Sequence, residues 1–325
     1  MAPSDNLYAT PPGASQQPIF LAGPTAVGKS ELALHLAELL GGEIISVDSM
    51  QVYRGLDVGT AKPSPADRAR IPHHLIDVCE LSESFDAAQF VQLAQAAVAA
   101  VHSRQHVPIF CGGTGLYFKA FLEGLGASPA TTEILRSEVE QTPLDQLLAE
   151  LQQRDPVTFE KIDRKNPRRV IRAVVVIRLT GRPFSDQRAT WNPEPPADNT
   201  AAAPRFFCFT RSREDLHRRI NTRVETMFAR GLLGETERLL KLGLEKNLTA
   251  MQAIGYRQVV EYLKGERTLP ETIELVKSRT RQYSKRQLSW FRAQKNVIWL
   301  EITENENAES MLQKVTTNFT SPHLW

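Results

Sequence analysis

Apolar positions in the first fifty residues follow two different spacings. A continuous apolar run at residues 19–22 precedes a glycine-rich turn, and apolar residues then recur every three or four positions, at Leu32, Leu36, Leu39 and Leu40. A second strand is predicted at residues 43–47, after a pair of glycines. Continuous runs of this length indicate buried strands, and the wider spacing indicates an amphipathic helix. The order strand, helix, strand predicts a parallel sheet.

The same order repeats further along the chain and is then interrupted. A helical segment at about residues 86–102 leads into an apolar run at 107–111 that also ends in glycines. Residues 124–200 carry helical pieces without strand alternation and end in a proline-rich stretch, so we expect an all-helical insertion there. Strand character returns at 205–210, and long amphipathic helices, a short strand and a last helix follow.

Composition narrows the class of protein without assigning a function. The chain has 325 residues, 42% hydrophobic and 23% charged, which is ordinary for a globular protein. No apolar run approaches the roughly 18 to 20 residues of a membrane helix, and residues 1–16, expected to form a disordered tail, carry no export signal. We therefore expect no membrane partner and a cytoplasmic location. The three cysteines are widely spaced, which argues against a zinc site or a disulfide framework.

The distribution of charge says more than the formal net charge of +2. Residues 275–300 contain no Asp or Glu but include Lys277, Arg279, Arg281, Lys285, Arg286, Arg292 and Lys295. Such a stretch is typical of a surface that binds a nucleic-acid backbone. At 100° per residue, Arg281, Lys285 and Arg292 share one helix face. The aromatic residues of the segment point elsewhere and are expected in the core: Tyr283, Trp290 and Phe291.

The glycine-rich turn after the first strand reads GPTAVGKS and matches the phosphate-binding loop Gly-x4-Gly-Lys-Ser in the required strand–loop–helix order. Inward-facing backbone N–H groups and a helix start form an anion site. Lys29 adds a positive charge, and Ser30 adds a hydroxyl group for Mg2+, the expected cofactor. The residues predicted to bind phosphate are Gly23, Pro24, Thr25, Ala26, Val27, Gly28, Lys29 and Ser30.

This loop makes the predicted fold an α/β fold with a P-loop NTPase-like parallel sheet flanked by helices. Residues 17–123 and 201–325 are expected to form that core, with basic helices near the C-terminal end. The all-helical insertion spans residues 124–200.

A phosphate site is not yet an ATP site, because a P-loop ATPase also places an acidic residue at the tip of a neighbouring strand. The strand at 107–111 ends in Gly112-Gly113-Thr114, without an acid. Asp48, after the strand at 43–47, is the carboxylate at a strand tip near the loop. It is consistent with a metal ligand, a general base or a turn residue. Polar and aromatic residues suited to contact a ring with hydrogen-bonding edges follow it: Ser49, Gln51 and Tyr53.

Several motifs, taken in order, carry a resemblance to a known family. They read GPTAVGKSELAL, ISVDSMQVYRGLDVGTAKP, IPHHLID, CGGTGLYFKAFLEGL, AIGYRQ and SKRQLSWFR. Together they closely resemble the tRNA dimethylallyltransferases, also called tRNA isopentenyltransferases, of the bacterial type without a C-terminal zinc finger. The resemblance runs from Gln17 to Leu300, and the DSMQVY…VGTAKP stretch is its most specific part.

The resemblance implies that the loop holds the diphosphate of dimethylallyl diphosphate rather than ATP. The acceptor would be N6 of the adenosine on the 3′ side of the anticodon, at position 37, in tRNAs that read codons beginning with U. It also implies roles for three residues: Asp48 as the base at N6, Thr114 beside it, and Arg223 as a clamp on the diphosphate. Arg219, one helical turn before Arg223, is a weaker candidate for the clamp.

Residues at the family's tRNA-contacting positions lie in five segments. The resemblance assigns to the tRNA anticodon stem-loop Asp48, Ser49, Met50, Gln51, Arg136, Arg168, Arg169, Arg172, Gln252, Gly255, Tyr256, Arg257, Lys285, Arg286, Gln287, Trp290 and Arg292. We expect Asn166 to cap the helix that begins at Pro167 and carries an arginine cluster. Because this helix belongs to the insertion, the insertion is expected to act as a lid on the tRNA. Nothing in the sequence demands more than a monomer.

The chain departs from the family pattern at two places in the insertion. The stretch GLGASPATTEILR lacks the Pro-x-Asp character usual before Arg136. Val175 stands where a Glu is common, so a salt bridge of the lid is expected to be missing.

Three other functions remain possible when the residues are considered without the resemblance. These are an adenylate isopentenyltransferase acting on free AMP, ADP or ATP, a nucleotide or small-molecule kinase, and a non-catalytic RNA-binding P-loop scaffold.

Overall fold

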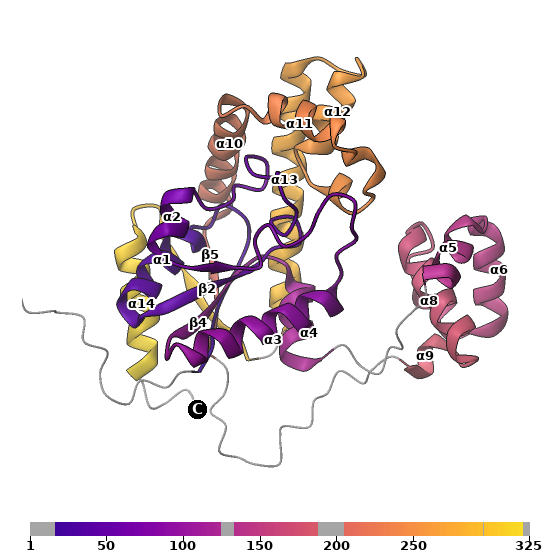
Figure 1. Cartoon of the computed structure of the whole chain (residues 1–325), viewed down its shortest axis with the longest axis horizontal. Coiled ribbons are helices and arrows are strands. Elements are labelled where there is room, and N and C mark those ends of the chain that lie inside the picture. Colours follow the sequence, from indigo (N-terminus) through magenta and orange to yellow (C-terminus); the bar gives the residue numbers. More distant parts are fainter. Residues whose placement is uncertain (1–16, 125–132, 188–204, 295, 321–325) are drawn as a thin grey trace, which may run out of the picture. The chain divides into compact units, whose positions relative to one another are not determined.

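The computed structural model describes residues 17–124, 133–187, 205–294 and 296–320 (Figure 1). The chain divides into two compact units, residues 1–121 with 200–325, and residues 122–199. The tail at residues 1–16, expected to be disordered, lies outside the described residues. Among the described helices, none combines the length and the apolar composition that crossing a bilayer requires.

The first unit is built on a six-stranded sheet whose neighbouring strands all run parallel. The strand order is β3-β2-β4-β1-β5-β6. The predicted α/β fold with a parallel sheet is confirmed. The strands are β1 (Ile19–Ala22), β2 (Gly42–Val47), β3 (His73–His74), β4 (Val107–Gly112), β5 (Arg205–Thr210) and β6 (Ile298–Glu301).

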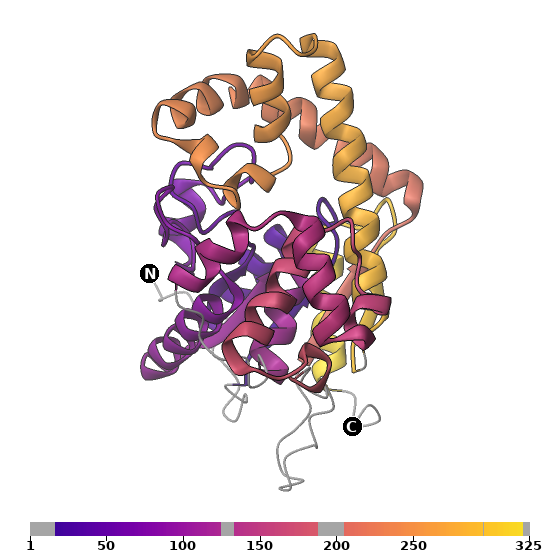
Figure 2. The same cartoon turned by 90° about the vertical axis from the view of Figure 1, so that its right-hand side faces the viewer.

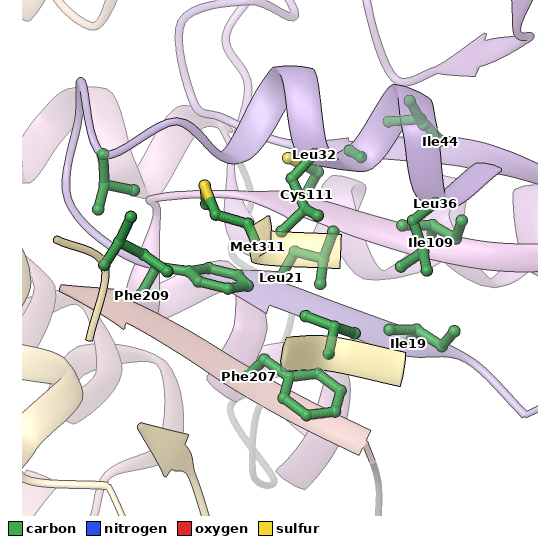
Figure 3. Close-up of a cluster of buried hydrophobic side chains, with 14 of the residues drawn as sticks. Ile19, Leu21, Leu32, Leu36, Ile44, Ile109, Cys111, Phe207, Phe209 and Met311 are labelled. Atoms are coloured by element: carbon green, nitrogen blue, oxygen red, sulfur yellow. The ribbon is translucent and has the colours of Figure 1, made fainter. Parts of the chain in front are cut away.

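Alternate residues of the central strands face two separate cores, because successive side chains in a strand point to opposite faces. On one face, Ile19 and Leu21 of β1 pack with leucines of α1 (Lys29–Leu40) and with Met311 of α14 (Ala308–Thr320), as Figure 3 shows. On the other face, Phe20 stacks on Phe110 with ring centroids 4.8 Å apart. Both faces are therefore covered, which explains the continuous apolar runs of the strands.

The remaining helices of this unit include one long element, α13 (Leu269–Arg292), which begins at a capping box on Thr268. Figure 2 shows α13 running from the region of α11 and α12 to the sheet. Phe291, near its end, is fully buried against Phe118 and Phe206, as its predicted core position requires. The other helices are α2 (Pro65–Arg70), α3 (Ala87–Ser103), α4 (Gly115–Glu123), α10 (Arg213–Ala229), α11 (Leu232–Lys241) and α12 (Tyr256–Leu263), with short 3-10 turns η1 (Leu244–Lys246) and η2 (Ala250–Gln252).

The second unit is helical throughout its described residues. Its helices are α5 (Glu133–Gln141), α6 (Leu144–Arg154), α7 (Pro156–Lys161), α8 (Pro167–Thr180) and α9 (Phe184–Gln187). Val175 of α8 lies in the apolar core of this unit, so the position where the family commonly has Glu is a packing position here. Pro167 starts α8 as predicted. The prediction that the Asn166 side chain caps α8 was wrong, because Asn166 occupies the cap position without a side-chain hydrogen bond.

Candidate active site

The phosphate-binding loop connects β1 to α1 and has three residues in left-handed backbone conformations. Gly23 has φ of 144°, Ala26 of 66° and Gly28 of 111°. Glycine is required at position 23, because a Cβ there would lie 2.7 Å from the carbonyl oxygen of Phe209. Gly28 occupies the cap position of α1, so the loop ends at a helix N-terminus. That arrangement directs backbone N–H groups toward an anion.

Lys29 is turned back onto its own loop. Its Nζ donates to the carbonyl oxygens of Gly23, at 2.9 Å, and Pro24, at 2.6 Å. Burial above all, and nearby Arg223, lower the pKa of Lys29 to about 8 against the opposing influence of Cys111 and Asp48. A lysine with this pKa loses its charge as the pH rises above about 8, and a bound anion favours its protonated form.

Asp48 and Thr114 meet because β2 and β4 are neighbours and their carboxyl ends lie at the same edge of the sheet. Asp48 Oδ1 accepts the backbone N–H groups of Met50, at 2.8 Å, and Gln51, at 3.2 Å. Thr114 Oγ1 accepts the N–H of Ser49 at 3.1 Å. One carboxylate oxygen therefore stabilises the turn, while no hydrogen bond from a described residue reaches Oδ2.

The two arginines considered as clamps have different surroundings. Arg219 Nε donates to the carbonyl oxygen of Ala26 at 2.8 Å, so this side chain braces the phosphate-binding loop. Arg223 makes no hydrogen bond or ion pair with a described residue. Burial lowers the pKa of Arg223 and the charge of Asp48 raises it. Arg223 is thus a half-buried cation close to a carboxylate, without a fixed partner.

Lys29, Asp48, Arg219 and Arg223 line one cavity with a volume of about 670 Å³ within the first unit, and Gly113, which directly precedes Thr114, lines it as well. The phosphate-binding loop contributes Lys29 and Ser30, the strand ends contribute Asp48 and Gly113, and α10 contributes Arg223. Cations gather where the loop lies, and a carboxylate with one open oxygen faces the same space. This arrangement can hold a phosphorylated or diphosphorylated molecule next to a group that accepts a proton.

The cavity offers few protein ligands for a metal ion. Ser30 is exposed, and Ser30, Glu31 and Asp48 all line the cavity. No cluster of three or more His, Cys, Asp or Glu side chains within the described ranges is arranged to hold a metal. Mg2+ keeps several water ligands and binds readily through one or two protein oxygens and substrate phosphates. The donor set therefore fits Mg2+ brought together with a diphosphate, and not a cage made by protein alone.

Tyr256 and Gln287, assigned to tRNA by the resemblance, are buried in the structure. Tyr256 is 0% exposed, and its hydroxyl donates to Glu235 at 2.6 Å and accepts the N–H of Gly59 at 3.1 Å. Gln287 is 7% exposed and bonded to two backbone groups. Packing across the fold removes both side chains from solvent and gives them partners within the protein, and their assignment to tRNA stays a prediction. Gly255 is buried beside Tyr256.

Other residues assigned to tRNA do lie on the surface of the first unit. Exposed positions are Gln252, Arg257, Lys285, Arg286 and Arg292. Arg281, expected on the same basic face, is held by Asn221, whose Oδ1 accepts from Nη1 at 2.7 Å. Trp290 is half-buried and meets Phe291 edge-to-face, so the expectation that it points into the core holds only in part.

The arginine cluster of the second unit is also exposed. Arg168, Arg169 and Arg172 occupy the first two turns of α8. Arg136 lies on α5, and its side chain is outside the described residues. Met50, Ser49 and Gln51 are half-buried. Gln51 Oε1 accepts the hydroxyl of Ser46 at 2.9 Å, and its Nε2 donates to the carbonyl oxygen of Thr60 at 3.2 Å.

Sequence reasoning missed Glu235 of α11. Its carboxylate accepts the N–H of Val58 at 3.0 Å and the hydroxyl of Tyr256, so it holds the VGTAKP segment that borders the cavity. No local pattern around Glu235 signals this contact, because its partner lies 177 residues earlier in the chain.

The chain matches the family model described as IPP transferase over residues 51–294. It is 41% identical over 304 residues to the tRNA dimethylallyltransferase of Pelotomaculum thermopropionicum, covering 91% of this chain and 94% of that protein. It is 44% identical over 303 residues to the tRNA dimethylallyltransferase of Halorhodospira halophila, covering 91% and 96%.

Solved structures agree with these relatives. The tRNA isopentenylpyrophosphate transferase of Bacillus halodurans superposes with a TM-score of 0.68 and 37% identity, covering 94% of this chain and 96% of that one. A eukaryotic dimethylallyltransferase acting on tRNA superposes with a TM-score of 0.74 and 27% identity, covering 93% and 79%.

Proposed function

The chain belongs to the IPP transferase family, and from this premise we propose that it is a tRNA dimethylallyltransferase. It transfers the dimethylallyl group of dimethylallyl diphosphate to N6 of the adenosine on the 3′ side of the anticodon, at position 37, in tRNAs that read codons beginning with U. The observation that carries the proposal is the single cavity in which the phosphate-binding loop, Arg223 and the open oxygen of Asp48 meet.

The leaving group is a diphosphate, and the cations of the cavity suit it. As the bond between the allylic carbon and the diphosphate oxygen breaks, negative charge builds up on that oxygen. Backbone N–H groups of the loop, Lys29 and Arg223 stabilise this charge. Arg223 is available because no described residue holds its guanidinium, and Lys29 exchanges its two loop carbonyl oxygens for the anion.

The acceptor is an aromatic amine, a weak nucleophile that gains from orientation and from loss of a proton. Asp48 Oδ2 accepts that proton as the bond from N6 to the allylic carbon forms. The N–H groups of Met50 and Gln51 fix the carboxylate through Oδ1, so its second oxygen keeps one direction. Thr114, whose Oγ1 accepts the N–H of Ser49, holds the neighbouring backbone.

Mg2+ is proposed as the cofactor, with Ser30 as its protein ligand beside the diphosphate oxygens. When bound, the ion adds positive charge next to the leaving group. The chain's own part is to present the Ser30 hydroxyl at the start of α1, and to hold the diphosphate through the loop.

An adenosine within the anticodon loop is stacked, so the base must leave the stack to reach the cavity. We propose that Lys285, Arg286 and Arg292 of α13 bind the RNA backbone electrostatically. The arginines at the start of α8 are proposed to contact the same stem-loop, with the second unit as a lid. A monomeric state and a cytoplasmic location are part of the proposal and rest on the sequence.

The test is a transfer assay with radiolabelled dimethylallyl diphosphate and Mg2+. The acceptors are an unmodified anticodon stem-loop with three adenosines beginning at position 36, the same stem-loop with guanosine at position 37, and AMP or ATP alone. We expect label on the first stem-loop only. Label on AMP or ATP would identify a free-nucleotide prenyltransferase, and no label on any acceptor would leave the kinase and the RNA-binding scaffold as the remaining functions.

A further inference from the structure

Helix α13 reaches the catalytic loops through one buried side chain, Gln287, which lines the cavity. Its Oε1 accepts the backbone N–H of Thr25, in the phosphate-binding loop, at 2.9 Å. Its Nε2 donates to the carbonyl oxygen of Gly113, after β4, at 3.0 Å. A single amide group therefore joins the loop after β1 to the loop after β4.

The glycines of the GGTG turn make room for this contact. A Cβ at Gly113 would overlap Nε2 of Gln287, and a Cβ at Gly115 would overlap the ring of Trp290. Gln287 and Trp290 are three residues apart and therefore lie on one face of α13. Gly113 and Gly115, which lack side chains, fit against the glutamine–tryptophan face of the helix, and this complementarity marks the contact as a built feature of the site.

Gly113 adjoins Thr114, so the contact also reaches the acceptor side of the cavity. Thr114 Oγ1 accepts the N–H of Ser49, the residue after Asp48. Tyr283, one turn before Gln287, lines the same cavity. Burial raises the pKa of Tyr283, and the hydroxyl of Thr114 and the amide of Gln287 act against this rise. The loop that holds the diphosphate and the turn that holds Asp48 thus share one buried polar group.

We propose that Gln287 is a positioning residue that keeps the phosphate-binding loop in register with the Gly113–Thr114 turn, and that it does not contact tRNA. The role of Gln287 in the transfer reaction rests on the proposed function. An amide suits the position because it accepts at one atom and donates at another. Lys285 and Arg286, which directly precede it, are exposed. One turn of α13 therefore carries two exposed cations, Lys285 and Arg286, and one buried amide, Gln287, which holds the phosphate-binding loop.

The test compares Gln287→Met with Gln282→Met, a matched change at an exposed position of the same helix. Binding of inorganic pyrophosphate with Mg2+ is measured by calorimetry, and binding of the anticodon stem-loop by filter retention. We expect Gln287→Met to weaken pyrophosphate binding on the order of tenfold, as loss of buried hydrogen bonds predicts, with stem-loop affinity within about twofold. KM for dimethylallyl diphosphate should rise by a similar factor. Gln282→Met should change neither affinity.

Weaker stem-loop binding with unchanged pyrophosphate binding would show that Gln287 contacts tRNA, and would overturn the proposal. Unchanged values for both ligands would overturn it as well. Amide exchange by NMR gives a readout on the unaltered protein, in case Gln287→Met does not fold. We expect the Thr25 N–H to be protected, and exchange as fast as in an unstructured peptide would contradict the contact.

Neither pyrophosphate binding nor amide exchange requires prenyl transfer. A protein that transfers no dimethylallyl group, but whose pyrophosphate affinity still falls on Gln287→Met, would refute the proposed function and leave the bracing role standing. A protein that transfers the group normally with methionine at this position would refute the bracing role alone.

Discussion

The two ends of strand β2 each carry an acidic residue, in opposite surroundings. Glu43, near the amino end, is 1% exposed and receives hydrogen bonds from three side chains. Arg104 donates through Nε and Nη2, each at 2.7 Å, while His74 and His106 lie at 2.6 and 2.7 Å. Asp48, directly after the carboxyl end, uses one oxygen for two backbone N–H groups and leaves the other open to the cavity.

The difference separates a carboxylate that stabilises the fold from one suited to chemistry. Hydrogen bonds from Arg104, and then from the two histidines, lower the pKa of Glu43 to about 2 in spite of its burial. With its oxygens occupied, Glu43 has little capacity left for a ligand. Asp48 raises the pKa of both Lys29 and Arg223 but forms no salt bridge with either within the described residues. A cavity that holds a carboxylate and cations without salt bridges between them can bind a substrate through these charges.

Replacing Asp48 by Asn should have the largest effect. The asparagine oxygen can still accept the N–H groups of Met50 and Gln51, so the turn and the Tm should stay nearly unchanged. The amide cannot take the N6 proton, and kcat for transfer to the stem-loop should fall about 10²- to 10⁴-fold. Single-turnover assays check this, with stem-loop affinity expected within a few fold of the original. A large loss of affinity with normal turnover would contradict the role as a base.

Replacing Glu43 by Gln should have the opposite profile. Arg104, His74 and His106 lose a charged acceptor, and the free energy of unfolding should fall by about 2 to 4 kcal/mol at pH 7, measured by urea denaturation. Activity per folded molecule should not change. If Glu43→Gln lowered kcat without lowering stability, the contrast between the two ends of β2 would not hold.

The same pair tests the pH dependence of stability. The pKa of Glu43 in the fold, about 2, lies below its ordinary value of 4.5, so its contribution is present above pH 4.5 and is lost as the pH falls toward 2. The stability difference between the original protein and Glu43→Gln should therefore shrink over this range. A constant difference would show that the charge of Glu43 is not the source of the stabilisation.

The smallest expected effect concerns Lys29. Burial lowers its pKa to about 8 in the protein without ligand, and a bound diphosphate requires the protonated amine. Above pH 8, binding must take up a proton, so affinity for pyrophosphate should fall by up to about tenfold per pH unit. Calorimetry between pH 7 and 10 measures the slope. Arginine stays protonated over this range, so the pyrophosphate affinity of Lys29→Arg should depend less on pH. An equal pH dependence in both proteins would show that it comes from ionisation of pyrophosphate and not of Lys29.

Local patterns in the sequence determined every strand except the two-residue β3, most helices and the composition of the site. The phosphate-binding loop is specified by eight consecutive residues between a strand and a helix, Asp48 comes directly after a predicted strand, and Thr114 follows two glycines after another. Because parallel strands place their carboxyl ends at one edge, the order of these runs along the chain predicted that Asp48 lies near the loop, whereas the place of Thr114 beside Asp48 came from the family resemblance. The apolar position of Phe291 likewise followed from helical periodicity.

Only the tertiary structure decided which polar side chains face a ligand and which support the fold. Gln287 bonds to a residue 262 positions away, and Glu235 to one 177 positions away. Arg219 braces the loop while Arg223, one turn later on the same helix, stays open to the cavity. Periodicity assigns a polar residue to a helix face, but its partner comes from elements that are distant in sequence. Whether such a polar side chain is buried or exposed therefore depends on tertiary packing, and no local sequence pattern encodes that packing.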